Sequence, residues 1–191
     1  MTPAVERMIG HWLRRVRAGD RHLACNDPRL ADAPETISLS SPAFNENGPM
    51  PRLYAGLGVG ENISPPLEWS NVPLGTKELV LILQDPDAPL PRPVVHLIAI
   101  GISPEMKGVP EGCLTPEENP PFRFGRGFMG RVGYAGPRPV RGHGPHRYVF
   151  QIFATRQQLD LPEKANLETV IAQMADVLLA RGRLTGVYER D

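Results

Sequence analysis

The distribution of proline is the sequence feature that most restricts how this chain can fold. Of the 22 prolines, 20 lie between Pro28 and Pro145, whereas the first 27 residues contain only Pro3 and the last 46 only Pro162. Proline removes a backbone donor and its ring clashes with the preceding helical turn, so this region cannot form a helix of any length. Short strands joined by structured loops are the natural alternative. Helices are therefore expected only near the two ends of the chain.

Length, charge and hydropathy limit the class of protein. The 191 residues fit one domain of ordinary size. Lys and Arg together number 21, as do Asp and Glu, so the net charge is zero and no basic surface for nucleic acid is indicated. The longest apolar run, residues 79–83, is far shorter than the roughly 20 residues that span a bilayer. Without a secretory signal, a cytoplasmic protein is expected, with Cys25 and Cys113 as free thiols.

The first 34 residues are predicted to form an amphipathic helix and a linker (residues 20–34), ahead of one domain over residues 35–191. Six apolar residues recur at steps of three and four, as on one face of a helix: Val5, Met8, Ile9, Trp12, Leu13 and Val16. The basic residues take the other face: Arg7, His11, Arg14 and Arg15. Such a helix can lie on an anionic membrane surface. We favour the alternative that its apolar face packs on the body of the protein or on a second subunit, and we expect a homodimer.

Strand patterns dominate the remainder of the chain. Residues 35–41 alternate apolar and polar side chains, which is typical of a strand with one buried face. Three nearly continuous apolar runs are predicted to form the centre of a sheet: 77–84, 94–100 and 147–154. Asn166 is typical of an N-cap, and the helix after it is predicted to end near Gly182, before a short strand over 184–188. The fold class is therefore mainly β.

Polar and turn residues stand at the ends of the apolar runs. They are Asp85, Pro86, Asp87, His146 and Tyr148, and His96 lies inside the otherwise apolar run over 94–100. Taken singly, a histidine in an apolar strand is more often a hydrogen-bonded core residue, and an aspartate before Ala-Pro is more often a turn residue. Taken together they favour one pocket, because buried polar groups are costly unless they serve one another or a ligand. His146 and Tyr148 alternate, so that their side chains point to the same face of a strand.

The chemistry of this cluster favours an anion. Asp85 could hold His96 or His146 in the protonated form, because a neighbouring carboxylate stabilises an imidazolium. The Tyr148 hydroxyl adds a donor, and backbone N–H groups of the loop over residues 133–145 can complete a concave anion site. The sequence therefore predicts a small cavity of neutral to positive charge that binds phosphate, sulfate or carboxylate.

Four segments carry a resemblance to a known family. They are ENISPPLEWSNVP (61–73), DPDAP (85–89), the isolated histidine of VVHLIAI (His96) and GHGPHRYVFQIFA (142–154). In order and spacing they resemble the phosphatidylethanolamine-binding proteins, in particular the bacterial Raf-kinase-inhibitor-like branch. With the flanking strands the resemblance covers roughly residues 35–190, and it does not extend to the N-terminal helix.

The resemblance implies two packed antiparallel sheets in a Greek-key arrangement, with helices at the edge and a small anion-binding cavity. The positions that match the family's ligand site are Asp85, Pro86, Asp87, His96, Gly136, Pro137, His146 and Tyr148. Ala88-Pro89 corresponds to a place where the family uses a cis proline. Arg138 departs from the small or neutral residue expected at the rim, which makes the rim more cationic or more closed. Family members are described as lipid-head-group binders and as modulators of kinases or proteases.

The same residues leave an enzyme open as a second hypothesis. An Asp–His pair can serve as general acid and base, as in a hydrolase. The sequence has no GxSxG motif, and neither cysteine is beside a histidine, so a nucleophile is missing. A metal hydrolase would use Asp85, Asp87, His143 and His146, but HGPH does not have helical metal-site spacing. The Arg and Phe residues interleaved over 122–131 indicate nucleic acid only weakly. We therefore predict a binding protein with no cofactor and no metal.

Overall fold

The computed structural model describes residues 2–190, which form two β-sheets, two α-helices and several short 3-10 turns. The helices are α1 (Pro3–Leu13) and α2 (Leu167–Met174). The strands are β1 (Ser38–Ser40), β2 (Gly48–Pro49), β3 (Leu67–Ser70), β4 (Glu78–Asp85), β5 (Val94–Ile102), β6 (Gly108–Val109), β7 (Arg123–Phe124), β8 (His146–Thr155) and β9 (Leu178–Tyr188). The 3-10 turns are η1 (Asp20–His22), η2 (Ala24–Asn26), η3 (Pro28–Leu30), η4 (Arg52–Tyr54), η5 (Pro116–Glu118) and η6 (Phe128–Gly130).

The larger sheet has the strand order β2-β9-β8-β4-β5-β7, and the smaller sheet the order β1-β3-β6. The three apolar runs predicted as the centre of a sheet are β8, β4 and β5, which lie side by side, so this prediction is confirmed. Every pairing between named strands is antiparallel except β2 with β9. After β5 the chain visits the smaller sheet as β6, returns at the edge of β5 as β7, and then crosses to the other side of β4 as β8.

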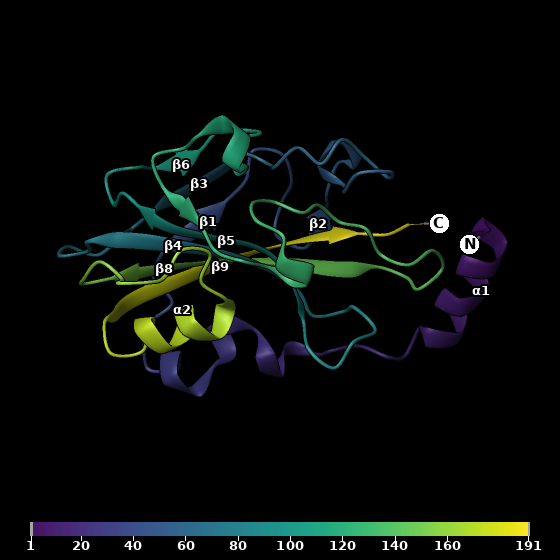
Figure 1. The fold of residues 1–191 in the computed structure, drawn as a ribbon, viewed down its shortest axis with the longest axis horizontal. Helices are drawn as coiled ribbons and strands as arrows, with labels where there is room; N and C mark the ends of the chain where they lie inside the picture. Colours follow the sequence, from purple (N-terminus) through teal and green to yellow (C-terminus); the bar gives the residue numbers. More distant parts are fainter. Residues whose placement is uncertain (1, 191) are drawn as a thin grey trace.

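The two faces of the larger sheet are covered by different layers. In Figure 1 the smaller sheet lies above it, and α2 lies below it with the segment that contains η1 to η3. Alternate residues of β4 face alternate layers, as the two-residue period of a strand requires. Leu81 and Leu83 pack in one apolar core with Trp69 of β3. Ile82 packs in the other core with Met174 of α2. The sheet is therefore buried on both faces, which explains the continuous apolar runs.

The segment over residues 20–34, predicted as a linker, is instead a folded part of the second core. Its residues Leu23, Cys25 and Leu30 are buried beneath the larger sheet. Two buried glutamines of the sheet fix its backbone. The Gln84 Oε1 accepts the Ala24 N–H at 2.8 Å, and the Gln151 Oε1 accepts the Cys25 N–H at 2.7 Å. The linker prediction failed because its polar, turn-rich sequence does not show which backbone groups the sheet satisfies. Cys25 and Cys113 are both free thiols, as expected.

The C-terminal helix is shorter than predicted. Asn166 is its N-cap, with the side-chain oxygen accepting the Thr169 N–H at 3.0 Å, but the helix ends at Met174. Gly182, predicted as the helix end, lies in the middle of β9 opposite Ile152 of β8. A Cβ at Gly182 would lie 2.0 Å from the Ile37 backbone oxygen, so the glycine permits a close approach of two backbone segments. Pairing along almost all of β8 therefore decides the structure of this segment.

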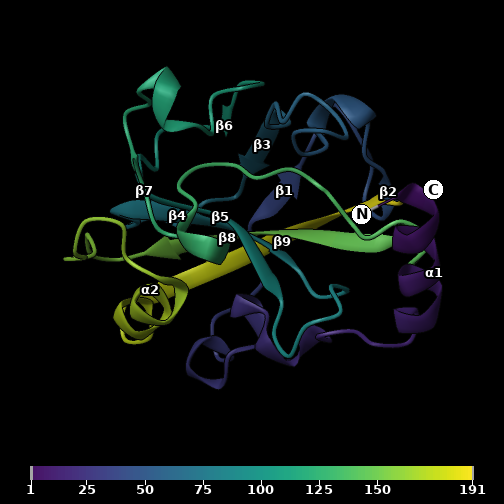
Figure 2. The same ribbon diagram turned by 45° about the vertical axis from the view of Figure 1, so that its right-hand side comes forward.

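Helix α1 stands at one end of the molecule, beside the end of β9 (Figures 1 and 2). The expectation that its apolar face packs on the body of the protein is wrong for most of that face, of which only Ile9 and Leu13 are partly buried, and packing on a second subunit stays a prediction. Met8 is 67% exposed and Trp12 is 84% exposed, and Gly10 is the buried residue of the helix. The body is contacted by a different face, because a Cβ at Gly10 would lie 2.0 Å from the Arg141 backbone oxygen. No helix within residues 2–190 is long and apolar enough to cross a membrane.

Replacing Gln151 with leucine is expected to reduce the free energy of unfolding by about 1–3 kcal/mol, because the buried Cys25 N–H loses its acceptor. Urea unfolding of the wild type and of Gln151→Leu measures the difference. Gln158→Leu, at an exposed position just beyond β8, is the matched control. Equal stability of the two variants would contradict the role of Gln151 in fixing residues 20–34.

Candidate functional site

Three strand ends meet at one edge of the larger sheet. Strand β4 finishes at Asp85, and its antiparallel neighbours β5 and β8 begin there with Val94 and His146. The register pairs Asp85 with Val94. A register irregularity pairs Leu83 with Leu97 but Gln84 with Val95, so that His96 falls between the two pairs. Antiparallel pairing therefore brings together the polar residues that stand at the ends of the apolar runs.

A cavity of about 610 Å³ opens at this edge. Four of the predicted site residues line it: Asp85, His96, Gly136 and His146. The other four, Pro86, Asp87, Pro137 and Tyr148, are not among the lining residues. Apolar and cationic side chains complete the wall: Leu57, Leu90, Phe128, Met129, Arg131 and Arg138. Two hollows of similar volume, about 670 and 580 Å³, lie elsewhere and contain none of the predicted site residues.

The deepest polar feature of the site is a chain of three buried side chains. The His146 Nδ1 lies 2.8 Å from the Asp85 Oδ2, and the His146 Nε2 lies 2.7 Å from the His143 Nδ1. The His143 Nε2 lies 2.9 Å from the Leu13 backbone oxygen and 3.2 Å from that of Val16. All three residues are at most 3% exposed. The chain therefore connects the cavity to the end of α1.

The hydrogen bonds of this chain fix its charge. Because carbonyl oxygens only accept, the His143 Nε2 must carry a hydrogen. One hydrogen is also needed in each of the two remaining contacts of His146, so the trio holds three. An ionised carboxylate with two neutral imidazoles supplies only two. The third hydrogen, shared between the His146 Nδ1 and the Asp85 Oδ2, makes the trio neutral. Burial lowers the pKa of His143, with the neighbouring His146 as the second cause, so that His143 is the neutral partner.

His96 differs from His146 in its partners and its charge. Its Nδ1 lies 2.5 Å from the Ala135 backbone oxygen, to which it donates, and its ring packs edge-on against Tyr148 with centroids 5.3 Å apart. Burial lowers the pKa of His96, against the opposing effect of Asp85. His96 is therefore neutral, and the Asp85 carboxyl group is bonded to His146 and not to His96. Burial, followed by the charge of Asp85, raises the pKa of Tyr148 far above its ordinary value, so its hydroxyl stays protonated.

Asp87 is placed as an anchor behind the cavity wall. Its Oδ2 accepts from the Arg147 N–H at 2.8 Å and from the Arg147 Nε at 2.9 Å, and its Oδ1 lies 3.1 Å from the Arg17 guanidinium. Burial alone would raise the pKa of Asp87, but the hydrogen bonds from Arg147 and the charge of Arg17 lower it below its ordinary value. Asp87 thus stays ionised and joins the DPDAP loop to β8 and to the segment after α1.

The DPDAP loop is held by backbone hydrogen bonds. The Asp85 Oδ1 accepts the N–H groups of Asp87 at 2.8 Å and Ala88 at 3.1 Å. The Ala88 oxygen accepts the Ala18 N–H at 3.0 Å and the Leu90 N–H at 2.8 Å. The expected cis bond between Ala88 and Pro89 is wrong, since peptide bonds throughout the described residues are trans. The loop satisfies its polar groups in the trans form.

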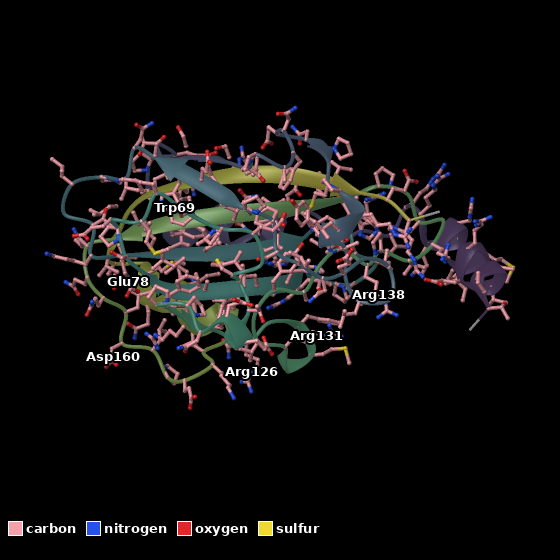
Figure 3. The ribbon with its side chains drawn as sticks, turned by 90° about the horizontal axis from the view of Figure 1, so that it is seen from above. Trp69, Glu78, Arg126, Arg131, Arg138 and Asp160 are labelled. Atoms are coloured by element: carbon pink, nitrogen blue, oxygen red, sulfur yellow. The ribbon has the colours of Figure 1, made fainter. Side chains whose placement is uncertain are left out.

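The opposite wall joins the predicted Gly136 and Arg138 to two residues that the sequence analysis did not select, Asn62 and Arg131. Asn62 adopts a left-handed backbone conformation (φ 60°), and its side-chain oxygen accepts the Gly136 N–H at 2.8 Å. A Cβ at Gly136 would lie 2.1 Å from the Tyr54 backbone oxygen, so only glycine fits. Asn62 lies in the segment that carries the family resemblance, and that position was the available signal. Arg131 and Arg138 lie on the same side of the molecule, away from Trp69 (Figure 3).

The described lining residues of the cavity include no hydroxyl or thiol nucleophile. No Ser, Thr or Cys is among its described lining residues, so no ordinary nucleophile faces the buried histidines. Within residues 2–190, no three His, Cys, Asp or Glu side chains are arranged to hold a metal ion. Asp85, His143 and His146 are instead bonded to one another, and Asp87 is bonded to arginines.

The lowered pKa values of His96 and His143 predict that stability falls in acid. Below about pH 6.5 the unfolded chain takes up protons on these histidines, whereas the folded chain takes them up only at lower pH. The unfolded state then binds more protons, so the free energy of unfolding decreases as the pH falls through this range. Urea unfolding at a series of pH values should show a shallower decrease for His96→Gln. His22→Gln, at an exposed position, should match the wild type, and an unchanged slope for His96→Gln would contradict the prediction.

The fold and the cavity together define a small, mainly β protein with a cavity at the edge of its larger sheet. The sequence model of the phosphatidylethanolamine-binding protein family matches residues 40–189. A UPF0098 protein of Aquifex aeolicus is 38% identical over 156 residues, which make up 81% of this chain and 90% of that protein. This chain belongs to the phosphatidylethanolamine-binding protein family, as its sequence segments predicted.

Solved structures agree with the fold. A phosphatidylethanolamine-binding protein homolog from Chlamydia trachomatis, CT736, shares 32% sequence identity with a TM-score of 0.74 and covers 82% of this chain and 99% of its own. YbcL of E. coli, described as a member of the mammalian PEBP family, shares 26% identity with a TM-score of 0.75 and the same coverage. The predicted fold of two packed sheets with helices at the edge is thereby confirmed. Helix α1 precedes the residues that the family model matches.

Proposed function

We propose that this protein binds a small molecule whose phosphate or other anionic group enters the cavity at the edge of the larger sheet. The observation that carries the proposal is the uncompensated positive charge of the cavity. The trio of Asp85, His143 and His146 is neutral in sum. Arg131 and Arg138 also line the cavity, and within residues 2–190 neither guanidinium has an ion-pair or hydrogen-bond partner. Two positive charges therefore face the ligand without an acidic counterpart.

The size and walls of the cavity favour a ligand with an organic part. A volume of about 610 Å³ lies within the roughly 300–1,000 Å³ of small-molecule sites and exceeds what an inorganic anion fills. Leu57, Phe128 and Met129 provide apolar contact at its mouth, and each is more than a third exposed. A phosphorylated head group with an attached chain matches both features. The names of the relatives in this family, which refer to phosphatidylethanolamine, support the same class of ligand.

A role without catalysis is part of the proposal. The described lining residues offer histidines and a carboxylate but no hydroxyl or thiol nucleophile, so a hydrolase would have to rely on water activated by His96. The His146 ring cannot serve as that base, because both of its nitrogens are engaged inside the protein. Modulation of a kinase or protease, and membership of the Raf-kinase-inhibitor-like branch, stay predictions from the family resemblance.

Calorimetric titration with O-phosphoethanolamine, inorganic phosphate and acetate tests the proposal. We expect the phosphorylated compounds to bind more tightly than acetate, with affinity about tenfold lower for Arg131→Gln or Arg138→Gln, because each loses a charged hydrogen bond. Lys77→Gln, just before the opposite end of β4, is the matched control and should bind like the wild type.

Two results would overturn the proposal. Undiminished phosphate affinity in the double variant Arg131→Gln/Arg138→Gln would remove the charge argument. Turnover of p-nitrophenyl phosphate or p-nitrophenyl acetate that disappears in His96→Gln would establish the hydrolase hypothesis instead. Circular dichroism of each variant confirms that it is folded, so that lost binding reports on the cavity.

A further inference from the structure

Helix α1 presents an apolar stripe that nothing in the described chain covers. Val5, Met8 and Trp12 recur on α1 at steps of three and four, and Val16 follows three residues after the helix ends. Each of the four is 42% exposed or more. Trp12 is the most exposed of them at 84%. Figure 2 shows the helix at the end of the molecule with open space on its outer side. A tryptophan and a methionine in water at helical spacing are unusual on a monomer surface, and they indicate a binding surface.

The helix is held in place by its other face, which fixes the outward direction of the stripe. Glu6 lies 2.8 Å from the Arg190 guanidinium beyond the end of β9. Gly10 lies against the backbone of Arg141, where a side chain would not fit. At the C-terminal end, the backbone oxygen of Leu13 accepts from the buried His143. The apolar stripe is therefore a built surface and not the chance exposure of a loose terminus.

The charges beside the stripe are all positive. The two acidic residues before residue 24 are both turned to internal partners, Glu6 to Arg190 and Asp20 to Arg147. Three exposed arginines beside the stripe have no ion-pair partner within residues 2–190: Arg7, Arg14 and Arg15. A second copy of the chain packed stripe against stripe would bring these arginines together with no acidic residue to meet them. An anionic surface would complement them.

We propose that α1 is an interfacial helix that lies on an anionic lipid bilayer, with the stripe in the head-group region. The apolar side chains would enter the boundary of the acyl chains, while the arginines contact lipid phosphates and anionic head groups. This inference goes beyond the proposed ligand site, because α1 lies outside the residues matched by the family model and the cavity takes no part in it. It would place the cavity-bearing domain at a membrane surface.

The fluorescence of Trp12 tests the proposal directly. The chain has two tryptophans, and Trp69 is only 3% exposed, so that a change of environment at the surface reports Trp12. Vesicles of phosphatidylcholine with phosphatidylglycerol should shift the emission to shorter wavelength and should pull the protein down on sedimentation. Vesicles of phosphatidylcholine alone should do neither, and high salt should release the protein because it screens the charges. Trp12→Phe should lose the shift and keep the sedimentation.

Two sets of variants separate the apolar and the charged contributions. Met8→Asp and the double variant Arg14→Gln/Arg15→Gln are each expected to lower the bound fraction about tenfold or more. Leu74→Asp, which replaces a fully exposed leucine in the turn between β3 and β4, is the control and should bind like the wild type. These side chains are in solvent, so thermal melting should confirm that each variant remains folded.

Three outcomes would overturn the proposal. Equal binding to vesicles with and without phosphatidylglycerol would remove the electrostatic argument. Undiminished vesicle binding by Met8→Asp would show that a surface other than the stripe contacts the bilayer. A shift of Trp12 emission with protein concentration in the absence of vesicles, together with dimers in analytical ultracentrifugation, would instead show that the stripe binds a second copy. Loss of ligand binding in the cavity variants does not affect any of these measurements, so the two proposals fail separately.

Discussion

Asp85 carries a carboxylate that is almost completely removed from water, and both of its oxygens are engaged. One oxygen accepts two backbone N–H groups of the DPDAP loop, and the other meets the imidazole of His146. A buried carboxylate without these partners would be strongly destabilising. The loop that follows β4 and the start of β8 are thus fixed to each other through one side chain. The cavity opens at the edge where these two elements are joined.

The same carboxylate begins a connection that reaches the N-terminal helix. The His146 ring is hydrogen-bonded to the His143 ring, and His143 donates to the backbone oxygen of Leu13 at the end of α1. Each contact requires one hydrogen, so the geometry determines both the tautomers and the total charge. The orientation of α1, with its apolar stripe turned to solvent, follows from this connection and from the Glu6 ion pair. The cavity and the exposed helix therefore share one set of buried polar contacts.

The distribution of charge explains how a chain with no net charge can hold two cationic regions. The acidic residues Asp87 and Glu6 are matched with Arg147 and Arg190, which join segments of the fold. The acids used in this way are not available to the other arginines. The cavity mouth and the outer side of α1 therefore keep arginines without acidic partners within the described residues. Total charge cannot reveal this separation, since it depends on which pairs the fold brings together.

The sequence by itself determined the mainly β class, the three central strands, the N-cap at Asn166 and the family. Proline distribution, apolar runs and motif segments are local signals. They depend only on residues close together in the sequence, so they predict structure without knowledge of the tertiary contacts. It also placed Asp85, His96 and His146 in one cluster, because strand ends are readable. Only the tertiary structure decided that Asp85 bonds to His146 and not to His96, that residues 20–34 belong to the core, and that Gly182 lies within a strand. Those outcomes depend on contacts between residues far apart in the sequence, where burial and hydrogen bonding outweigh local preference.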